Sequence, residues 1–278
     1  MGHSASRTLR SLTCGLSANI TSSSSTPSEP VTPTHYIIAY EGNIGAGKTQ
    51  ILTHHPPLNN IEILLEPDFD NVGGVKPLTA YYRQPHKYAT TVQFLVAAKQ
   101  ARLIKKPLIS KIRILERSPD SSRNIFIETG RYFGLINKIE YECLHYTYED
   151  LINSCPLLAI VYLRTNPKTC QTRIANRNSI ENITKYTLLD ALNTFHDSHY
   201  ETLMPRKCNK PAVIVVQAED EKQTVQELLD KFQFMSNKLA NQVTFLTFID
   251  EIASQNLSDY LTHIKLDEGF ARNNQYPS

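Results

Sequence analysis

Cysteine is sparse in this sequence, and its placement excludes two kinds of site. The 278 residues contain five cysteines, an odd number, and no two of them form a C-x-x-C pair. This pattern argues against a disulfide framework or a zinc site and favours a reducing compartment. The nine histidines show no H-x-x-x-H or H-E-x-x-H spacing, so we interpret them as surface or core residues. The cysteines are Cys14, Cys143, Cys155, Cys170 and Cys208.

Long apolar runs and a strong charge of one sign are also missing. The longest apolar run, Leu157–Leu163, has the length of a strand and falls short of the roughly 18–20 residues that span a bilayer. The net charge is +2, and the basic cluster at Lys105-Lys106 is short and broken by Pro107. We interpret that cluster as a solvated helix end or loop. The sequence therefore predicts no membrane span and no nucleic-acid partner.

Residues 1–33 are rich in serine, threonine and proline and contain almost no large apolar residue after Leu16. Such a segment cannot bury enough surface to offset the entropy of ordering it, so we predict a disordered tail. Arg7 and Arg10, with no acidic residue before Glu29, are compatible with a mitochondrial transit peptide. The first residues also fit a loose myristoylation pattern, and a plain flexible tail accounts for them equally well. We expect a cytoplasmic protein, with mitochondrial import as the alternative.

The rest of the chain alternates apolar, β-prone runs with helical stretches. This alternation predicts an α/β doubly wound fold, with a parallel sheet covered by helices on both faces. We place one domain over residues 34–235 and a helical extension with a polar tail over residues 236–278. Five strands are expected at Tyr36–Tyr40, Ile61–Leu65, Ile112–Leu115, Leu157–Leu163 and Ala212–Val216, and helices at Lys48–His54, Leu78–Ile104 (interrupted only by Pro85 near its start), Thr169–Asn178, Leu188–Leu203 and Lys222–Met235.

The segment between the first predicted strand and the first predicted helix matches G-x-x-x-x-G-K-[ST] at every fixed position. Glycines let successive backbone N–H groups face inward, and the next helix presents its N-terminus to an anion. Lys48 would supply a charge to the β- and γ-phosphates of a nucleoside triphosphate, and the Thr49 hydroxyl would ligate Mg²⁺. A chance match is expected about once in a hundred chains of this length. The loop consists of Gly42, Asn43, Ile44, Gly45, Ala46, Gly47, Lys48 and Thr49.

This loop alone does not distinguish a kinase from a GTPase or a motor ATPase. The stretch 70–73 fits the GTPase pattern D-x-x-G, but it is turn-like and no N-K-x-D accompanies it. Glu66 follows the apolar strand Ile61–Leu65, so it projects from the carboxyl end of the sheet, where α/β folds bind ligands. Glu116 and Arg117 follow another apolar strand and lie at the same edge. The alternatives are a strand-end acid before a turn for Glu66 and a surface ion pair for the other two residues.

Five motifs, in order and with near-family spacing, resemble those of the deoxynucleoside kinases. The family includes deoxycytidine, deoxyguanosine and mitochondrial thymidine kinases, and the likeness covers about Tyr36 to Met235. It implies the P-loop kinase fold, ATP as phosphoryl donor with Mg²⁺, a small-molecule deoxynucleoside as acceptor, and a homodimer. The motifs are Glu41–Thr49, Glu66-Pro67, Tyr82 with Gln93, Glu116-Arg117-Ser118, and Arg173-Ile174-x-x-Arg177.

The resemblance assigns roles to the residues around the loop. Glu66 would accept the proton of the sugar 5′-hydroxyl. Glu116 would be the second protein ligand of Mg²⁺, and Arg117 would neutralise charge near the 5′-oxygen and the transferred phosphoryl group. Thymidylate kinases usually carry Asp-Arg where Glu116-Arg117 stands, which makes this motif the more discriminating one.

The resemblance also implies residues for the nucleoside and for ATP. Tyr82 would bind the 3′-hydroxyl, Gln93 would pair with the base through its carboxamide, and Phe126 would stack on the base, with ordinary helix packing as the alternative for each. Arg173 and Arg177, four apart on one predicted helical face, would lie on a lid over ATP; a solvated basic face is their alternative. Further along, Asp220 resembles a residue of the family's adenine-side loop.

Three departures from the family bear on the substrate. Gln100 and Ser122 stand where deoxycytidine and deoxyguanosine kinases place an arginine and an aspartate, which leaves room for the 5-methyl group of thymine. The resemblance therefore favours thymidine or pyrimidine deoxynucleosides broadly. The lid is one residue shorter and lacks one arginine, with Glu181 taken as a 3′-hydroxyl-binding residue. The usual tryptophan after Glu-Pro is absent, and Phe69 is expected to fill its space.

Two alternative functions stay open at this point. A nucleoside monophosphate kinase, such as a thymidylate kinase, would share the loop and the fold, but Glu116-Arg117-Ser118 disfavours it. A nucleotide-binding protein with little turnover would fit the reduced lid. Lys48, Glu66 and Arg117 argue against that second alternative, since all three are residues that the reaction needs.

Overall fold

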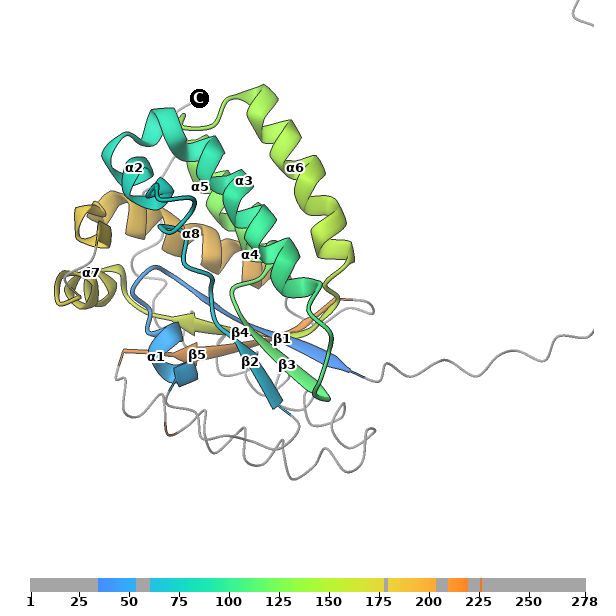
Figure 1. The fold of residues 1–278 in the computed structure, drawn as a ribbon. Helices are drawn as coiled ribbons and strands as arrows, with labels where there is room; N and C mark the ends of the chain where they lie inside the picture. Colours follow the sequence, from blue (N-terminus) through green and yellow to red (C-terminus); the bar gives the residue numbers. More distant parts are fainter. Residues whose placement is uncertain (1–34, 54–60, 178–179, 204–209, 220–225, 227–278) are drawn as a thin grey trace, which may run out of the picture. The chain divides into compact units, whose positions relative to one another are not determined.

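The computed structural model describes residues 35–53, 61–177, 180–203, 210–219 and 226 (Figure 1). Five parallel strands form one sheet in the order β2-β3-β1-β4-β5. The predicted strands and the parallel α/β architecture are confirmed. The strands are β1 (Tyr36–Gly42), β2 (Ile61–Leu64), β3 (Ile112–Glu116), β4 (Leu157–Arg164) and β5 (Ala212–Gln217).

Helices lie on both faces of this sheet. In Figure 1, α1 is on one side, and α3, α6 and α8 are on the other. The helices are α1 (Lys48–Thr53), α2 (Pro77–Arg83), α3 (Pro85–Ile104), α4 (Pro119–Ser121), α5 (Glu128–Tyr132), α6 (Lys138–Asn153), α7 (Pro167–Ala175) and α8 (Tyr186–Leu203), with a π-helix at Ser122–Ile127 and a 3₁₀ turn at Ile180–Ile183.

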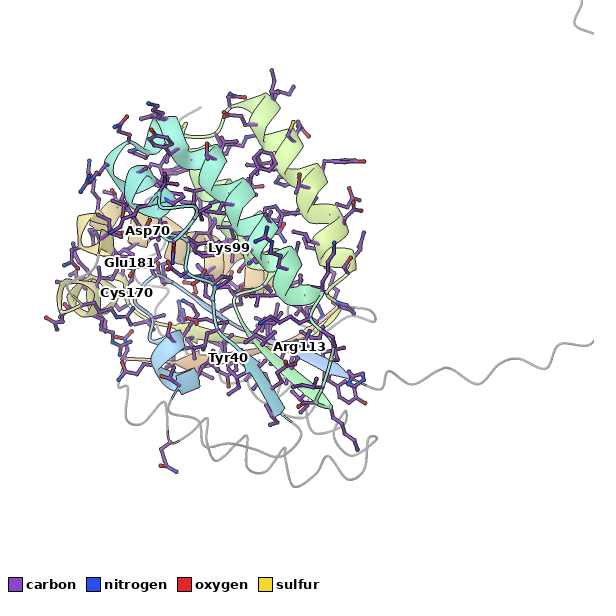
Figure 2. The ribbon with its side chains drawn as sticks, viewed as in Figure 1. Tyr40, Asp70, Lys99, Arg113, Cys170 and Glu181 are labelled. Atoms are coloured by element: carbon purple, nitrogen blue, oxygen red, sulfur yellow. The ribbon has the colours of Figure 1, made fainter. Side chains whose placement is uncertain are left out.

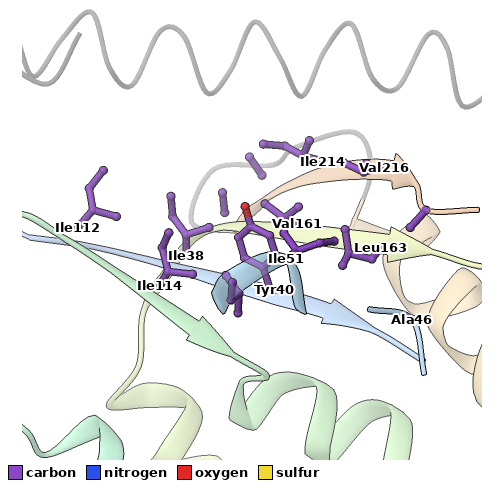
Figure 3. Packing of buried hydrophobic residues seen from close by; sticks show 14 of the residues in the cluster. Ile38, Tyr40, Ala46, Ile51, Ile112, Ile114, Val161, Leu163, Ile214 and Val216 are labelled. Atoms are coloured by element: carbon purple, nitrogen blue, oxygen red, sulfur yellow. The ribbon is translucent and has the colours of Figure 1, made fainter. Parts of the chain in front are cut away.

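The core follows from the alternation of side chains along strands that are buried on both faces. Ile38 and Tyr40 of β1 pack with Ile51 of α1, as Figure 3 shows. The intervening residue Ile37 packs on the opposite face, in a cluster that Ile104 of α3 joins. Successive side chains of a strand point to opposite faces, so a continuous apolar run such as β1 requires cover on both sides.

The predicted helical stretch Leu78–Ile104 consists of two helices, α2 and α3, and the break lies at Pro85, where an interruption was expected. Gln84 separates α2 from α3 and has a non-helical backbone, with φ −137° and ψ 70°. A residue before proline is disfavoured in the helical region, and Pro85 therefore forces the break at this position. The break turns α2 away from α3 and brings both helices to the walls of one pocket, described below.

Helix α6 was not predicted. Its N-terminus carries a capping box: the Asn137 side chain accepts from the Glu140 backbone N–H, and the Glu140 side chain accepts from the Asn137 backbone N–H. The N-x-x-E spacing is the signal that identifies such a helix start. Three predicted features lie outside the described residues, apart from residue 226: the tail 1–33, the helix 222–235 and the extension 236–278.

Candidate active site

The P-loop connects the end of β1 to the start of α1. Gly45 and Gly47 have φ of +80° and +100°, a region that other residues rarely adopt. A Cβ atom at Gly45 would lie 2.7 Å from the carbonyl oxygen of Cys170, so a larger residue would also collide with α7. Glycine is therefore required here both for the backbone curl and for the close approach of α7.

Lys48 lies buried at the first position of α1. Its ammonium group donates to the carbonyl oxygens of Gly42, at 3.0 Å, and Asn43, at 2.9 Å. Burial, followed by the nearby Arg117 charge, lowers the pKa of Lys48 to about 8, and the carboxylates around it oppose that shift. The side chain is thus held inside the loop, where phosphate oxygens of a triphosphate would bind.

The residues predicted at the carboxyl ends of β2 and β3 meet beside this loop. The Thr49 hydroxyl donates to Glu116 Oε1 at 2.5 Å, and the backbone N–H of Glu66 donates to Glu116 Oε2 at 3.1 Å. Arg117 Nε lies 3.2 Å from Glu66 Oε1. Because β2, β3 and β1 are adjacent and parallel, their ends deliver an acid, a second acid and a guanidinium to one edge of the sheet.

Arg117 is fixed from several directions. It is the only residue other than glycine with positive φ, +65°, in the part of the chain that the structure describes. Its backbone N–H donates to the carbonyl oxygen of Tyr40, and its Nη1 donates to the carbonyl oxygen of Gly42 at 3.0 Å. Its guanidinium lies 4.5 Å from the ring centre of Phe126. A left-handed conformation at a residue of this size costs on the order of 1–3 kcal/mol, so it persists only where surrounding contacts impose it.

Electrostatics at this edge act in opposite directions on Glu66. Burial raises the pKa of the Glu66 carboxyl, and the neighbouring Arg117 and Lys48 charges lower it. Burial lowers the pKa of Arg117, but the nearby carboxylates, Glu66 foremost, outweigh it and raise this pKa above its usual value. The effect of burial is the larger one, so the pKa of Glu66 lies above its usual value, which makes the carboxylate a better proton acceptor.

A pocket of about 120 Å³ opens next to Glu66 and Arg117. It brings together the predicted nucleoside-binding residues from α2, α3, the π-helix and the 3₁₀ turn, and Phe69, which was expected to replace the missing tryptophan, is part of its wall. Figure 2 labels Glu181 in that turn, between α7 and α8. The predicted residues that line the pocket are Glu66, Phe69, Tyr82, Gln93, Arg117, Ser122, Phe126 and Glu181.

Two polar side chains of the pocket, Gln93 and Tyr82, are suited to bind a ligand through hydrogen bonds. Gln93 Oε1 is buried and has no hydrogen-bond partner among the described residues, which suits an amide that pairs with a ligand. Burial raises the pKa of Tyr82, and the nearby Glu181 carboxylate raises it further. The Tyr82 phenol is therefore a neutral hydrogen-bond donor at any ordinary pH.

Gln100 and Ser122 form a buried neutral pair at the edge of the pocket. Gln100 Nε2 donates to Ser122 Oγ at 3.0 Å, and the Ser122 hydroxyl lies 3.3 Å from Gln100 Oε1 and from the carbonyl oxygen of Ser118. Only Ser122 of the two lines the pocket. Neither side chain carries a charge, so this part of the wall is neutral and presents the Ser122 hydroxyl to a ligand.

The arginines predicted for the lid do not share a helical face, and this prediction is wrong. Helix α7 ends at Ala175, so Arg177 lies beyond it and is exposed. Arg173 is on the helix, and its guanidinium donates to Ala46 O at 3.1 Å and to Ala218 O at 2.9 Å. Arg173 therefore connects the P-loop to the segment after β5. Asp220 lies outside the described residues.

The site fits Mg²⁺ by its donor chemistry. Mg²⁺ takes oxygen ligands, and in kinases it is held by one or two protein groups together with substrate phosphates. Thr49 and Glu116 supply a hydroxyl and a carboxylate in direct contact.

No cluster of three or more His, Cys, Asp or Glu side chains suited to a metal occurs within the described ranges, and no helix there is long and apolar enough to cross a bilayer.

Two groups of residues in this region were missed by sequence reasoning. The first is Glu41, which the resemblance includes at the start of the loop motif but to which it gave no role; it is buried, and its carboxylate accepts hydrogen bonds from Ser118. The second group forms apolar and small parts of the pocket wall, and its members follow no motif. They include Leu78, Tyr81, Val92, Val96, Thr129, Phe133, Leu188 and Leu192.

Comparison with known proteins gives a consistent result. The protein-family model described as deoxynucleoside kinase matches residues 38–244. Thymidine kinase 2, mitochondrial, of Homo sapiens is 31% identical over 201 residues, which cover 70% of this chain and 75% of the human protein. Deoxyguanosine kinase of Dictyostelium discoideum is 29% identical over 147 residues, covering 51% of this chain and 50% of that protein. Deoxycytidine kinase 2 of Gallus gallus is 27% identical over 175 residues, covering 52% and 65% respectively.

Proposed function

The chain belongs to the deoxynucleoside kinase family, whose members are ATP-dependent phosphotransferases, and we propose that it acts on thymidine or on pyrimidine deoxynucleosides broadly. In this reaction the γ-phosphoryl group of ATP passes to the 5′-hydroxyl of the nucleoside. The observation that carries the proposal is the neutral Gln100–Ser122 pair. Its member Ser122 lines the same pocket as Glu66 and Arg117.

Glu66 is the proposed base. The transition state of phosphoryl transfer is loose, so the enzyme mainly positions the reactants and stabilises charge. Glu66 holds the 5′-hydroxyl by a hydrogen bond and takes its proton late in the transfer. Its contact with Arg117 supports this role, because the guanidinium positions the partly buried carboxylate and favours its charged form, which burial disfavours.

Lys48 and Arg117 are the proposed charge-stabilising groups. Both are buried next to the P-loop, one at the start of α1 and the other after β3. Fixed cations in a site shielded from water stabilise charge on the transferring group more strongly than the same cations would in water. Mg²⁺, held by Thr49 and Glu116, would supply further neutralisation of the phosphates. We further propose that Arg177, exposed after α7, and Asp220 contact ATP.

The nucleoside is proposed to lie in the pocket with its sugar toward Glu66. Tyr82 and Glu181 bind the 3′-hydroxyl, Gln93 pairs with the base edge, and Phe126 stacks on the base. The unpaired Gln93 Oε1 and the neutral Tyr82 phenol support this placement. Gln100 and Ser122 lack the charges that would favour an exocyclic amino group, and they leave space for the thymine methyl group.

A panel of substrates tests the proposal. Purified full-length protein would be incubated with ATP and Mg²⁺ and with each of the four deoxynucleosides or thymidine monophosphate, and product formation would be followed by chromatography. We expect the highest kcat/KM for thymidine or for both pyrimidine deoxynucleosides. Efficient phosphorylation of deoxyguanosine with none of thymidine would contradict the proposed specificity. Turnover of thymidine monophosphate alone would contradict the proposed reaction.

Assembly and location are further proposals. Helix α6 carries Ile139 and Tyr146, each 77% exposed, and burial of such side chains would favour a homodimer. Light scattering of the purified protein measures this assembly directly. For location, we propose the cytoplasm, with mitochondrial import as the alternative that one relative's name suggests. A fluorescent fusion of residues 1–33 distinguishes the two compartments.

A further inference from the structure

Glu41 is a fully buried carboxyl group next to the active site. It is the second-last residue of β1, has no exposed surface, and is absent from the lining of the nucleoside pocket. Its Oε1 accepts two hydrogen bonds from Ser118, one from the backbone N–H at 2.8 Å and one from the hydroxyl at 2.6 Å. An acid in this position joins the entry of the P-loop to the residue that follows Arg117.

Burying a carboxyl group is costly unless other groups compensate it. Burial raises the pKa of Glu41 to about 7, while the Arg117 charge and the Ser118 hydroxyl act in the opposite direction. The charged and titratable groups that interact with it are Lys48 on α1, Arg117 and Asp120 after β3, Cys155 before β4, and Tyr200 on α8. The proposed phosphoryl transfer uses neither carboxyl oxygen of Glu41, so the presence of this buried acid needs a different explanation.

The geometry of Arg117 indicates that role. Arg117 adopts a left-handed backbone and lies between two fixed residues, Glu116 at the end of β3 and Ser118 bound to Glu41. Its side chain reaches both Gly42 O and Glu66. If Ser118 were released, the strained backbone would be free to relax, and the guanidinium would move with it.

We propose that Glu41 is a positioning residue for phosphoryl transfer, because its double hydrogen bond to Ser118 holds Arg117 in the conformation in which the guanidinium contacts Glu66 and the P-loop. This inference rests on the proposed kinase reaction. Misplacement of a reacting group by about 1 Å can cost on the order of 10²-fold in rate. Because Glu41 lies outside the pocket, its loss should affect kcat far more than the KM values for ATP and nucleoside.

Kinetics of four variants test this inference, with the substrate that the wild-type panel identifies. We expect Glu41→Ala to lower kcat on the order of 10²-fold, with both KM values within about threefold of wild type. Glu41→Gln should recover most of this loss, since its amide oxygen can still accept from Ser118. Ser118→Ala removes one of the two donors and should lower kcat by about threefold to tenfold.

Glu62→Ala is the matched control. Glu62 lies on β2 and forms an ion pair with the buried Arg113 at 2.8 Å, away from the P-loop. Its loss also leaves a buried arginine without its partner, so stability falls while kcat of the folded protein stays unchanged. Circular dichroism gives the folded fraction of every variant.

Three results would overturn the inference: kcat of Glu41→Ala within twofold of wild type, a kcat loss no larger than that of Glu62→Ala, or a loss confined to KM. If Glu41→Ala does not fold, Ser118→Ala and Glu41→Gln decide. A kcat of Ser118→Ala equal to that of wild type contradicts the inference. A kcat of Glu41→Gln lowered on the order of 10²-fold contradicts it too. An inactive wild-type protein instead contradicts the proposed function, so the two failures are distinguishable.

Discussion

Arg117 Nε lies 3.2 Å from Glu66 Oε1, across the ends of two neighbouring strands. The two residues are far apart in sequence, but β2 and β3 pair in parallel with Leu64 opposite Leu115. The register therefore places the residues that follow each strand side by side. Burial raises the pKa of Glu66, and this contact partly offsets that effect because the guanidinium favours the charged carboxylate.

Glu66→Gln should remove the proposed base with little effect on the fold. The amide can still bind a hydroxyl but cannot take its proton, so kcat should fall by about 10²–10⁴-fold. The KM for ATP should change little, because Glu66 lies on the nucleoside side of the P-loop. Steady-state assays of ADP release measure both quantities.

Asp68→Asn is the control for that variant. Asp68 lies two residues further along and is exposed, and its Oδ1 accepts a hydrogen bond from the backbone N–H of Asp70 at 2.8 Å. An asparagine can make the same bond, so its kcat should equal that of wild type. Unchanged turnover in Glu66→Gln would show that another group accepts the proton.

Replacing the neutral pair by a charged one should change the base preference. The double variant Gln100→Arg with Ser122→Asp introduces an ion pair at the edge of the pocket and reduces the space beside the base. We expect the ratio of kcat/KM for thymidine to that for deoxycytidine to fall at least about tenfold. Competition between the two nucleosides in one reaction measures the ratio directly.

Single variants of this pair provide the comparison. Ser122→Asp alone buries a carboxylate opposite Gln100, without a cation, and should reduce activity toward both nucleosides. Recovery in the double variant would show that the two side chains act together. A double variant with an unchanged substrate ratio would mean that other residues of the pocket determine the base.

Much of the fold could be predicted from the sequence because its signals are strong and local. The runs at Tyr36, Leu157 and Ala212 are continuous and apolar, as expected for strands covered on both faces. Helix α6 escaped prediction since most of its residues are polar or exposed, with Leu144 and Tyr148 its only fully buried ones among the described residues. Its capping box was the available signal.

From the sequence one could predict which residues lie at the ends of neighbouring strands, but not details that depend on tertiary contacts or on where a helix ends. Parallel strands bring Glu66 and Glu116 to one edge in any sheet that orders β2 next to β3. The resemblance placed Gln100 and Ser122 near the base, but nothing in a single sequence indicates that their side chains form a hydrogen bond with each other. The position of Arg177 was wrong because helix ends are set by local capping, and here Asn176 ends α7.

Arg113 should be a determinant of stability, without a role in catalysis. Its side chain is 2% exposed, and it donates to Glu62 and to the carbonyl oxygens of Lys106 and Pro107. Figure 2 shows it at the other end of the sheet from Glu181. Arg113→Met leaves the Glu62 carboxylate without its partner and should lower the free energy of unfolding by about 3–5 kcal/mol.

Adding Glu62→Met to that variant should recover part of the loss, since no unpaired carboxylate then remains at this end of the sheet. Chemical denaturation followed by circular dichroism gives the free energies, as the chain has no tryptophan for fluorescence. The KM values of both variants should match wild type at a temperature where they are folded. Equal stability of wild type and Arg113→Met would show that the ion pair makes no net contribution.

The charge of Lys48 should make ATP affinity fall at alkaline pH. Burial lowers the pKa of Lys48 to about 8, against about 10.4 for an unperturbed lysine. Phosphates bind the protonated form, so above pH 8 the affinity for ATP should drop by up to tenfold per pH unit, while that for the nucleoside stays constant. Calorimetric titrations between about pH 7 and pH 10 measure both affinities.

Protein stability should respond to the same titration in the opposite direction. A lysine with a depressed pKa in the folded state binds fewer protons there than in the unfolded state between about pH 8 and 10.4. Its contribution to stability therefore increases as pH rises through this window. The difference between wild type and Lys48→Met isolates this contribution from other groups. A pH-independent ATP affinity, together with a constant stability difference, would show that Lys48 keeps its proton throughout this range and that its contacts with Gly42 and Asn43 outweigh burial.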